Sequence, residues 1–141
     1  MGSEMCIRDR VLSVGTEQHF PWAEYDLAEQ IATLQNETLS EVCAGHPDRF
    51  VPLGVVSLQH PQLAAKQINN SVKNLGHRGC MITGNIMGQE LSDSKFHPFW
   101  SKAEELGVVI FIHPRVPKSG NPRLQGRGFL TNMIGLSLIH I

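Results

Sequence analysis

The sequence lacks the features that mark several classes of protein. It has no CxxC pair, and its three cysteines, Cys6, Cys43 and Cys80, lie far apart, so neither a disulfide framework nor a thiolate zinc site is indicated. It has no run of about 18 apolar residues and no secretory signal. The 141 residues carry a formal net charge of -1, which argues against a nucleic-acid surface. We therefore expect a cytoplasmic protein with neither nucleic acid nor membrane as a partner.

The two ends of the chain are related to each other. Residues 5–10 (MCIRDR) and residues 136–141 (LSLIHI) can be encoded by the two strands of one inverted DNA repeat. Such a repeat resembles the tag that a transposase leaves at both ends of a sequencing fragment, and tags are set aside before a fold is argued. We therefore expect residues 1–10 and 136–141 to be non-native, and residues 11–135 to be an internal piece of a longer domain.

Between these ends, apolar runs alternate with amphipathic stretches. Apolar runs predict four strands, at residues 11–14, 50–58, 78–82 and 108–112. Helical spacing predicts three helices, at residues 23–44, 61–75 and about 93–106. The first of these helices should bury a stripe made of Leu27, Ile31, Leu34 and Val42. No hairpin signal separates the strands, so the pattern indicates consecutive parallel βα units.

Two α/β architectures are built from such units. A flavodoxin-like open sheet needs about five strands and fits this length. An eight-stranded (β/α)8 TIM barrel needs about 250 residues, so four strands make half of it. The related ends favour a partial barrel. Because four strands leave two edges open and expose apolar faces, we expect the isolated chain to aggregate or two halves to pair.

Active sites lie at the carboxyl ends of the strands in both architectures. His113 follows the most apolar strand, where an imidazole can act as a metal ligand, a general base or a hydrogen-bonded core residue. The other strand ends carry residues 16–22, residues 59–60 and residues 83–85. His60 precedes a proline at a helix start, which indicates capping or exposure rather than chemistry.

Several motifs occur together in one order along the chain. They are PDRF at residues 47–50, ELSD at 90–93, PFW at 98–100, AEELG at 103–107 and IHP at 112–114. In this combination the chain resembles the amidohydrolase-related family, and within it the branch of aminocarboxymuconate-semialdehyde and resorcylate decarboxylases.

The resemblance implies a metal-dependent (β/α)8 barrel of which this chain carries the second to fifth strands. It implies that His113, the histidine of the IHP motif, is a ligand of a divalent metal, with zinc expected first and manganese as the alternative. The implied reaction is the loss of carbon dioxide from an unsaturated or aromatic carboxylate, which makes the protein a carboxy-lyase acting on a small molecule. The full-length protein is expected to be a homo-oligomer.

The resemblance also implies that the other metal ligands lie on strands outside this chain. Since a catalytic metal needs about three protein ligands, we expect the isolated chain to be inactive and to bind metal poorly. Two alternatives stay open: a hydrolase of the same superfamily that also uses His113, and a non-catalytic flavodoxin-like binding module in which His113 is structural.

Overall fold

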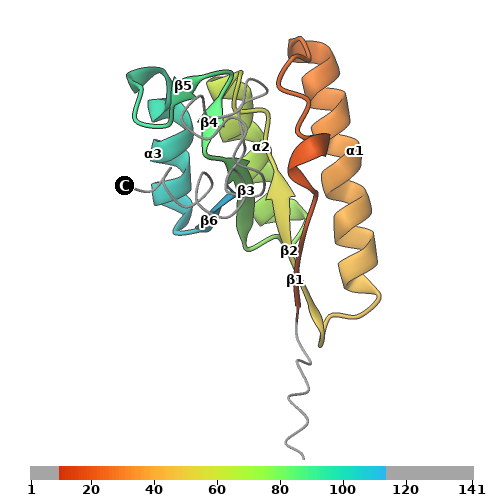
Figure 1. Ribbon diagram of the computed structural model, residues 1–141. Coiled ribbons are helices and arrows are strands. Elements are labelled where there is room, and N and C mark those ends of the chain that lie inside the picture. The colour runs from red at the N-terminus through yellow and green to blue at the C-terminus, as the bar shows by residue number, and fades with distance from the viewer. Residues whose placement is uncertain (1–9, 114–141) are drawn as a thin grey trace, which may run out of the picture.

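A computed structural model describes residues 10–113 (Figure 1). Four strands form the main sheet: β1 (Arg10–Ser13), β2 (Phe50–Val55), β3 (Gly79–Thr83) and β6 (Val109–His113). Their order in the sheet is β1-β2-β3-β6, and every neighbouring pair is parallel. Strands that follow one another in this sheet therefore also lie side by side, as the sequence predicted.

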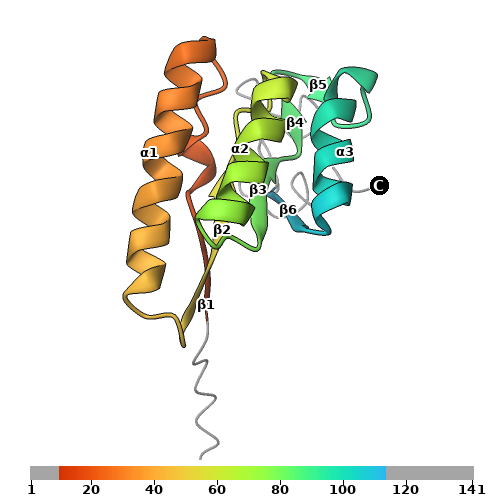
Figure 2. The same cartoon turned by 180° about the vertical axis from the view of Figure 1, so that it is seen from behind.

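Three helices connect these strands: α1 (Tyr25–Ala44), α2 (Pro61–Asn74) and α3 (His97–Leu106). The two opposite views show all three helices on one face of the sheet (Figures 1 and 2). A doubly wound sheet has helices on both faces, and its strand order reverses at a switch point. Sequential strand order with helices on one face is instead the arrangement of consecutive units of a (β/α)8 barrel, so the fold is a partial barrel.

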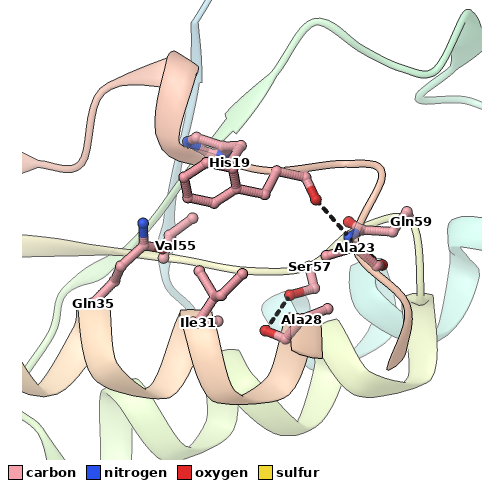
Figure 3. Close-up of a pocket in the computed structure, with 10 residues that line it drawn as sticks. His19, Ala23, Ala28, Ile31, Gln35, Val55, Ser57 and Gln59 are labelled. Carbon is pink, nitrogen blue, oxygen red and sulfur yellow. Dashed lines mark hydrogen bonds between the residues drawn. The ribbon is translucent and has the colours of Figure 1, made fainter. Parts of the chain in front are cut away.

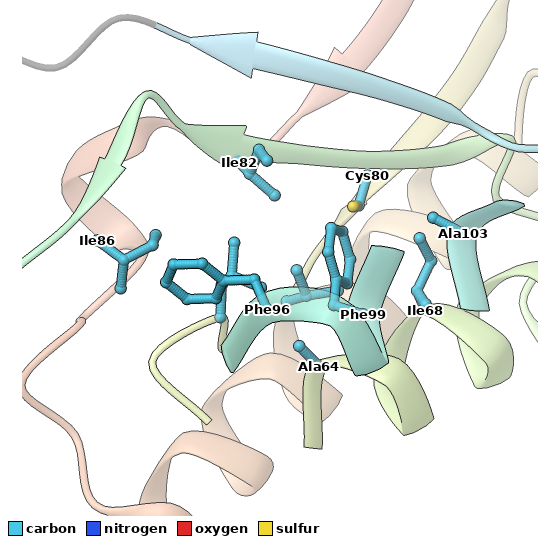
Figure 4. Close-up of a cluster of buried hydrophobic side chains, with 10 residues drawn as sticks. Ala64, Ile68, Cys80, Ile82, Ile86, Phe96, Phe99 and Ala103 are labelled. Carbon is cyan, nitrogen blue, oxygen red and sulfur yellow. The ribbon is translucent and has the colours of Figure 1, made fainter. Parts of the chain in front are cut away.

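The main core lies between the sheet and the helices α2 and α3. Figure 4 shows Cys80 and Ile82 of β3 directed toward Phe96 and Phe99, both fully buried side chains. Two residues of α2, Ala64 and Ile68, close this cluster from the neighbouring helix. Alternate residues of β3 thus supply one apolar face to the helices, as period-two alternation requires.

The strand β2 ends earlier than predicted because side chains replace its sheet hydrogen bonds. The amide of Asn36 on α1 donates to the carbonyl oxygen of Val55 (2.9 Å) and accepts from its backbone N–H (2.8 Å). Two residues later, the backbone N–H of Ser57 donates to the side-chain oxygen of Gln67 on α2 (2.7 Å). The apolar run continues to residue 58, but its last residues pack on the helices and do not extend the sheet.

The helix α1 buries only part of the stripe that its sequence predicted, because Ile31 is partly buried and packs on Ala28 and Leu63 but the other members are exposed. Leu34 and Val42 are 66% and 51% exposed, and Leu27 is also exposed. The buried face consists of small or polar residues instead: Ala28, Ala32, Asn36 and Cys43. Small side chains let the helix approach the sheet closely, while Leu27, Leu34 and Val42 are exposed.

A short hairpin follows β3 and was not predicted. It pairs β4 (Asn85–Ile86) with β5 (Gln89–Glu90) in antiparallel fashion. The turn residues Met87 and Gly88 have φ values of 53° and 83°, and two positive φ values are characteristic of the tight turns that join hairpin strands. Methionine is a rare residue at the first of these positions, so residues 85–90 carry no recognisable hairpin motif. Among the helices within residues 10–113, none combines the length and apolar character of a membrane span.

Candidate functional site

His113 is the last residue of β6 and is partly buried at the carboxyl end of the sheet. Its backbone oxygen accepts a hydrogen bond from the backbone N–H of Gly84 (3.1 Å), and its register partner on β3 is Thr83. The ring of Phe111 meets the imidazole edge-on, with 6.4 Å between the ring centroids. The end of β3 therefore fixes the backbone from which His113 extends.

The register shows which face of the sheet carries His113. It shares its face with Val109 and Phe111, because side chains alternate along a strand. The residues between them belong to the opposite face, where Ile110 packs against the helix-covered core. His113 therefore lies on the face that the helices do not cover, and this face becomes the interior of a closed barrel.

Thr83 stabilises the rim beside His113. Its side chain is buried, and its hydroxyl donates to the backbone oxygen of Asn85 (2.8 Å). The side-chain oxygen of Asn85 accepts in turn from the backbone N–H of Gly88 (3.2 Å). These bonds connect the end of β3 to the β4–β5 hairpin, so the rim next to His113 has a defined shape.

The candidate residues after β2 hold a loop in place. The amide of Gln59 donates to the backbone oxygens of Phe20 and Ala23, both at 3.3 Å. The Nε2 atom of His60 lies 3.0 Å from the oxygen of Ala23, and its ring contacts that of Tyr25. Its side chain makes no capping bond to α2. Gln59 and His60 are therefore anchors of the loop that follows β1.

Three cavities formed by described residues do not include His113. One of about 10 Å³ lies between the β1 loop, α1 and β2, bordered by Ser57 and Gln59 (Figure 3), and has room for about one water molecule. Two larger ones, of about 300 and 270 Å³, share Gly76 and Arg78 and lie at the amino ends of the strands. Because His113 is at the opposite ends of the strands, neither large cavity includes it.

The metal-binding capacity of residues 10–113 is limited. Within this range no three His, Cys, Asp or Glu residues are grouped so that they could hold a metal ion. Burial raises the pKa of Cys80 to about 12, so this thiol stays protonated. Since catalytic metals usually have three protein ligands, His113 provides one donor and the described residues do not fit a complete metal site.

His77 is a buried residue to which the sequence assigned no role. It is 2% exposed and packs against Gly54 of β2, next to Asn36 and Ser71. Burial lowers the pKa of His77, and the backbone of Asn36 offsets part of that effect. The residue lies just before β3, at the amino ends of the strands, whereas His113 lies at their carboxyl ends, so the two histidines do not form one site. The local sequence around His77 is typical of a turn, and it does not predict that the side chain is buried.

Comparisons with known proteins agree with the architecture. The family model described as "Amidohydrolase" matches residues 12–131. The chain is 29% identical over 127 residues to γ-resorcylate decarboxylase of Rhodococcus jostii, covering 84% of this chain and 39% of the relative. It is 30% identical over 112 residues to 2-amino-3-carboxymuconate-6-semialdehyde decarboxylase of Dictyostelium discoideum, covering 74% and 31%.

A solved structure extends the comparison to the fold. The crystal structure of 5-carboxyvanillate decarboxylase from Novosphingobium aromaticivorans, in complex with manganese and 4-hydroxy-3-methoxy-5-nitrobenzoic acid, matches with a TM-score of 0.85 at 27% identity. The match covers 93% of this chain and 38% of that one. The chain thus spans well under half the length of the relatives that it matches.

Proposed function

Because the chain belongs to the amidohydrolase family, we propose that it carries part of the catalytic barrel of a metal-dependent decarboxylase, a carboxy-lyase for an aromatic or unsaturated carboxylate. One observation carries the proposal. His113 stands at the carboxyl end of β6, on the face of the sheet that forms the barrel interior, which is where a (β/α)8 barrel holds its catalytic groups. The substrate is a small carboxylate, and the complete protein is a homo-oligomer.

In this proposal His113 is one ligand of a divalent metal. The similar decarboxylase structure contains manganese, which favours manganese; zinc, which the family resemblance led us to expect first, has no support from that structure. Residues 10–113 do not complete a metal site, so the other ligands and the proton donor are expected on strands beyond these residues. The overall reaction replaces the carboxyl group of the substrate by a proton, with release of carbon dioxide.

The proposal can be tested with the complete protein. Overlapping DNA reads would extend the coding sequence on both sides of this chain, and the encoded protein would then be assayed. With Mn²⁺ and γ-resorcylate or 5-carboxyvanillate as substrate, we expect carbon dioxide release that a chelator abolishes. His113→Ala should lower the rate at least 100-fold and reduce bound manganese, since a ligand is lost. His97→Ala, at the exposed start of α3, is the matched control and should keep both.

Two results would contradict the proposal. A His113→Ala variant with unchanged manganese content would remove the ligand role. Hydrolysis of amides or lactones without decarboxylation would favour the hydrolase. The 141-residue chain assayed in parallel should release no carbon dioxide above the rate in buffer.

A further inference from the structure

The bend after β3 brings Asn85 close to His113. Thr83 is the register partner of His113, and the backbone N–H of Gly84 donates to the backbone oxygen of His113 (3.1 Å). Asn85 is the next residue along the chain and begins β4. Since each residue of extended chain spans about 3.3 Å, the Cα atom of Asn85 lies within roughly 7 Å of that of Thr83. A small aromatic acid that contacts His113 can therefore reach Asn85.

Asn85 lies on the same side of the chain as Thr83. Ile82 and Ile86 both belong to the buried cluster that packs against α3 (Figure 4). Thr83 follows Ile82 and Asn85 precedes Ile86, so both belong to the opposite side, because side chains alternate along extended chain. This is the side of the sheet that carries His113 and that the helices do not cover.

One hydrogen bond fixes the orientation of the Asn85 amide. Its side-chain oxygen accepts from the backbone N–H of Gly88 (3.2 Å). A backbone N–H can only donate, so the amide atom that faces it is the oxygen and not the nitrogen. The planar amide then directs its Nδ2 atom away from the turn. Within residues 10–113 this nitrogen has no acceptor, and the side chain is half-exposed, so its two N–H groups are available to a ligand.

The turn that holds the amide has a costly backbone conformation. Met87 has a φ of 53°, in the left-handed region that few residues other than glycine, asparagine and aspartate adopt, and its side chain is 70% exposed. With Gly88 at a φ of 83°, this conformation presents the Gly88 N–H to Asn85. Strained backbone is concentrated at functional sites, where neighbouring groups hold it in place. The strain therefore supports a functional role for the group that the turn orients.

From this arrangement we propose that the Asn85 amide binds the carboxylate of the substrate beside His113. The proposal rests on the decarboxylase function proposed above, which supplies an aromatic or unsaturated carboxylate as the ligand. Because Gly88 engages the amide oxygen, the group that Asn85 presents to the mouth is a donor. Carboxylate oxygens are acceptors, and hydrogen bonds to them are charge-assisted and strong. Asn85 is thus a substrate-binding residue that the sequence alone did not single out.

The reaction predicts how the loss of this bond changes the kinetics. Negative charge leaves the carboxylate as carbon dioxide forms, so a hydrogen bond to the carboxylate is stronger in the bound substrate than in the transition state. Only interactions that strengthen in the transition state accelerate the chemical step. Loss of the Asn85 donor should therefore raise KM and leave kcat unchanged or higher. A hydrogen bond to a charged group changes affinity about 10- to 100-fold, and KM should rise by about this factor.

Two substitutions of Asn85 in the complete protein test the proposal. Asn85→Asp keeps an oxygen for the N–H of Gly88 and loses the donors, while Asn85→Ala loses the donors without adding charge. Both should raise KM for γ-resorcylate at least about 10-fold and keep the bound manganese, unlike His113→Ala. Asn70→Asp is the matched control, because Asn70 is exposed on α2 and its side-chain oxygen also accepts a hydrogen bond, from Asn74 (2.6 Å). It should leave KM unchanged.

A matched ligand shows which part of the substrate Asn85 contacts. Resorcinol has the ring and hydroxyl groups of γ-resorcylate without the carboxylate, so its inhibition constant should stay the same in both Asn85 variants. An unchanged KM, a fall in kcat at constant KM, or an inhibition constant for resorcinol that rises as much as KM would overturn the inference.

Calorimetric titration with γ-resorcylate separates this inference from the proposed function. Binding without release of carbon dioxide would contradict the decarboxylase function alone, and the affinities of the same variants would then decide the role of Asn85. They should be at least about 10-fold weaker than that of the original protein. Equal affinities, or a complete protein that does not bind γ-resorcylate, would overturn the role of Asn85.

Discussion

Adding one methyl group at Gly54 should destabilise the chain, although glycine in a strand usually weakens it. A Cβ atom on Gly54 would lie 2.7 Å from Nδ1 of His77 and 3.0 Å from the side-chain oxygen of Asn36. Non-bonded heavy atoms involving carbon pack at about 3.5 Å or more, so both neighbours would have to move by roughly half an ångström or more.

Neither neighbour has room to move. Asn36 makes two hydrogen bonds to the backbone of Val55, and His77 is 2% exposed. Overpacking of a core costs about 1–3 kcal/mol, and each lost hydrogen bond would add about 1 kcal/mol. Replacing glycine offsets about 0.4–1 kcal/mol by restricting the unfolded chain. We therefore expect Gly54→Ala to lower the free energy of unfolding by about 1–3 kcal/mol.

Urea unfolding followed by far-ultraviolet circular dichroism, at one fixed protein concentration, measures this change. With a denaturant slope of about 1–3 kcal/mol per M, the midpoint should fall by roughly 1 M. Gly45→Ala is the matched control, because Gly45 has a helical φ of -66° and the new carbon would lie 3.5 Å from the backbone oxygen of Val42, an ordinary contact. That variant should be stabilised. A Gly54→Ala midpoint at or above that of the original chain would refute the packing of His77 and Asn36 against β2.

Two further predictions concern buried titratable side chains. Burial lowers the pKa of His77 from its ordinary 6.5, so the folded chain holds it neutral while the unfolded chain binds a proton. Stability should therefore decrease as the pH falls below about 6.5, by up to about 1.4 kcal/mol per pH unit, and His77→Gln should reduce this slope in urea titrations; an unchanged slope would contradict it. Since burial raises the pKa of Cys80 to about 12, iodoacetamide near pH 8 should leave this thiol unmodified until urea is added. Mass spectrometry checks this, with Met87→Cys as the exposed control, and alkylation of Cys80 in the folded chain would contradict it.

The arrangement of the main sheet could be predicted from the sequence because each strand and helix has a local signal. The strand that ends at His113 is an uninterrupted apolar run, and the helix before it stops at Gly107, whose φ is 60°. These local signals predict that His113 lies at the end of a strand, and the structure has it as the last residue of β6.

Contacts between distant segments could not be predicted in the same way. Asn36 is polar and lies in the middle of a helix, and nothing in the local sequence marks it as buried. It is 3% exposed because it bonds to the backbone of Val55, 19 residues away. Because this face of α1 packs on the sheet, Leu34 is 66% exposed, against its expected orientation. Such contacts depend on the tertiary structure, so the periodicity of the sequence does not predict them.

The exposed apolar face and the incomplete metal site have one common cause. In a parallel barrel the functional groups come from the ends of several strands, so groups that would act together with His113 are expected on strands in other parts of the wall. Those same strands are the ones that would cover Val109 and Phe111 on the inner face. Strands that close the barrel would therefore bury this face and complete the surroundings of His113 in one step. For this reason the site is a property of barrel closure rather than of the segment that carries His113.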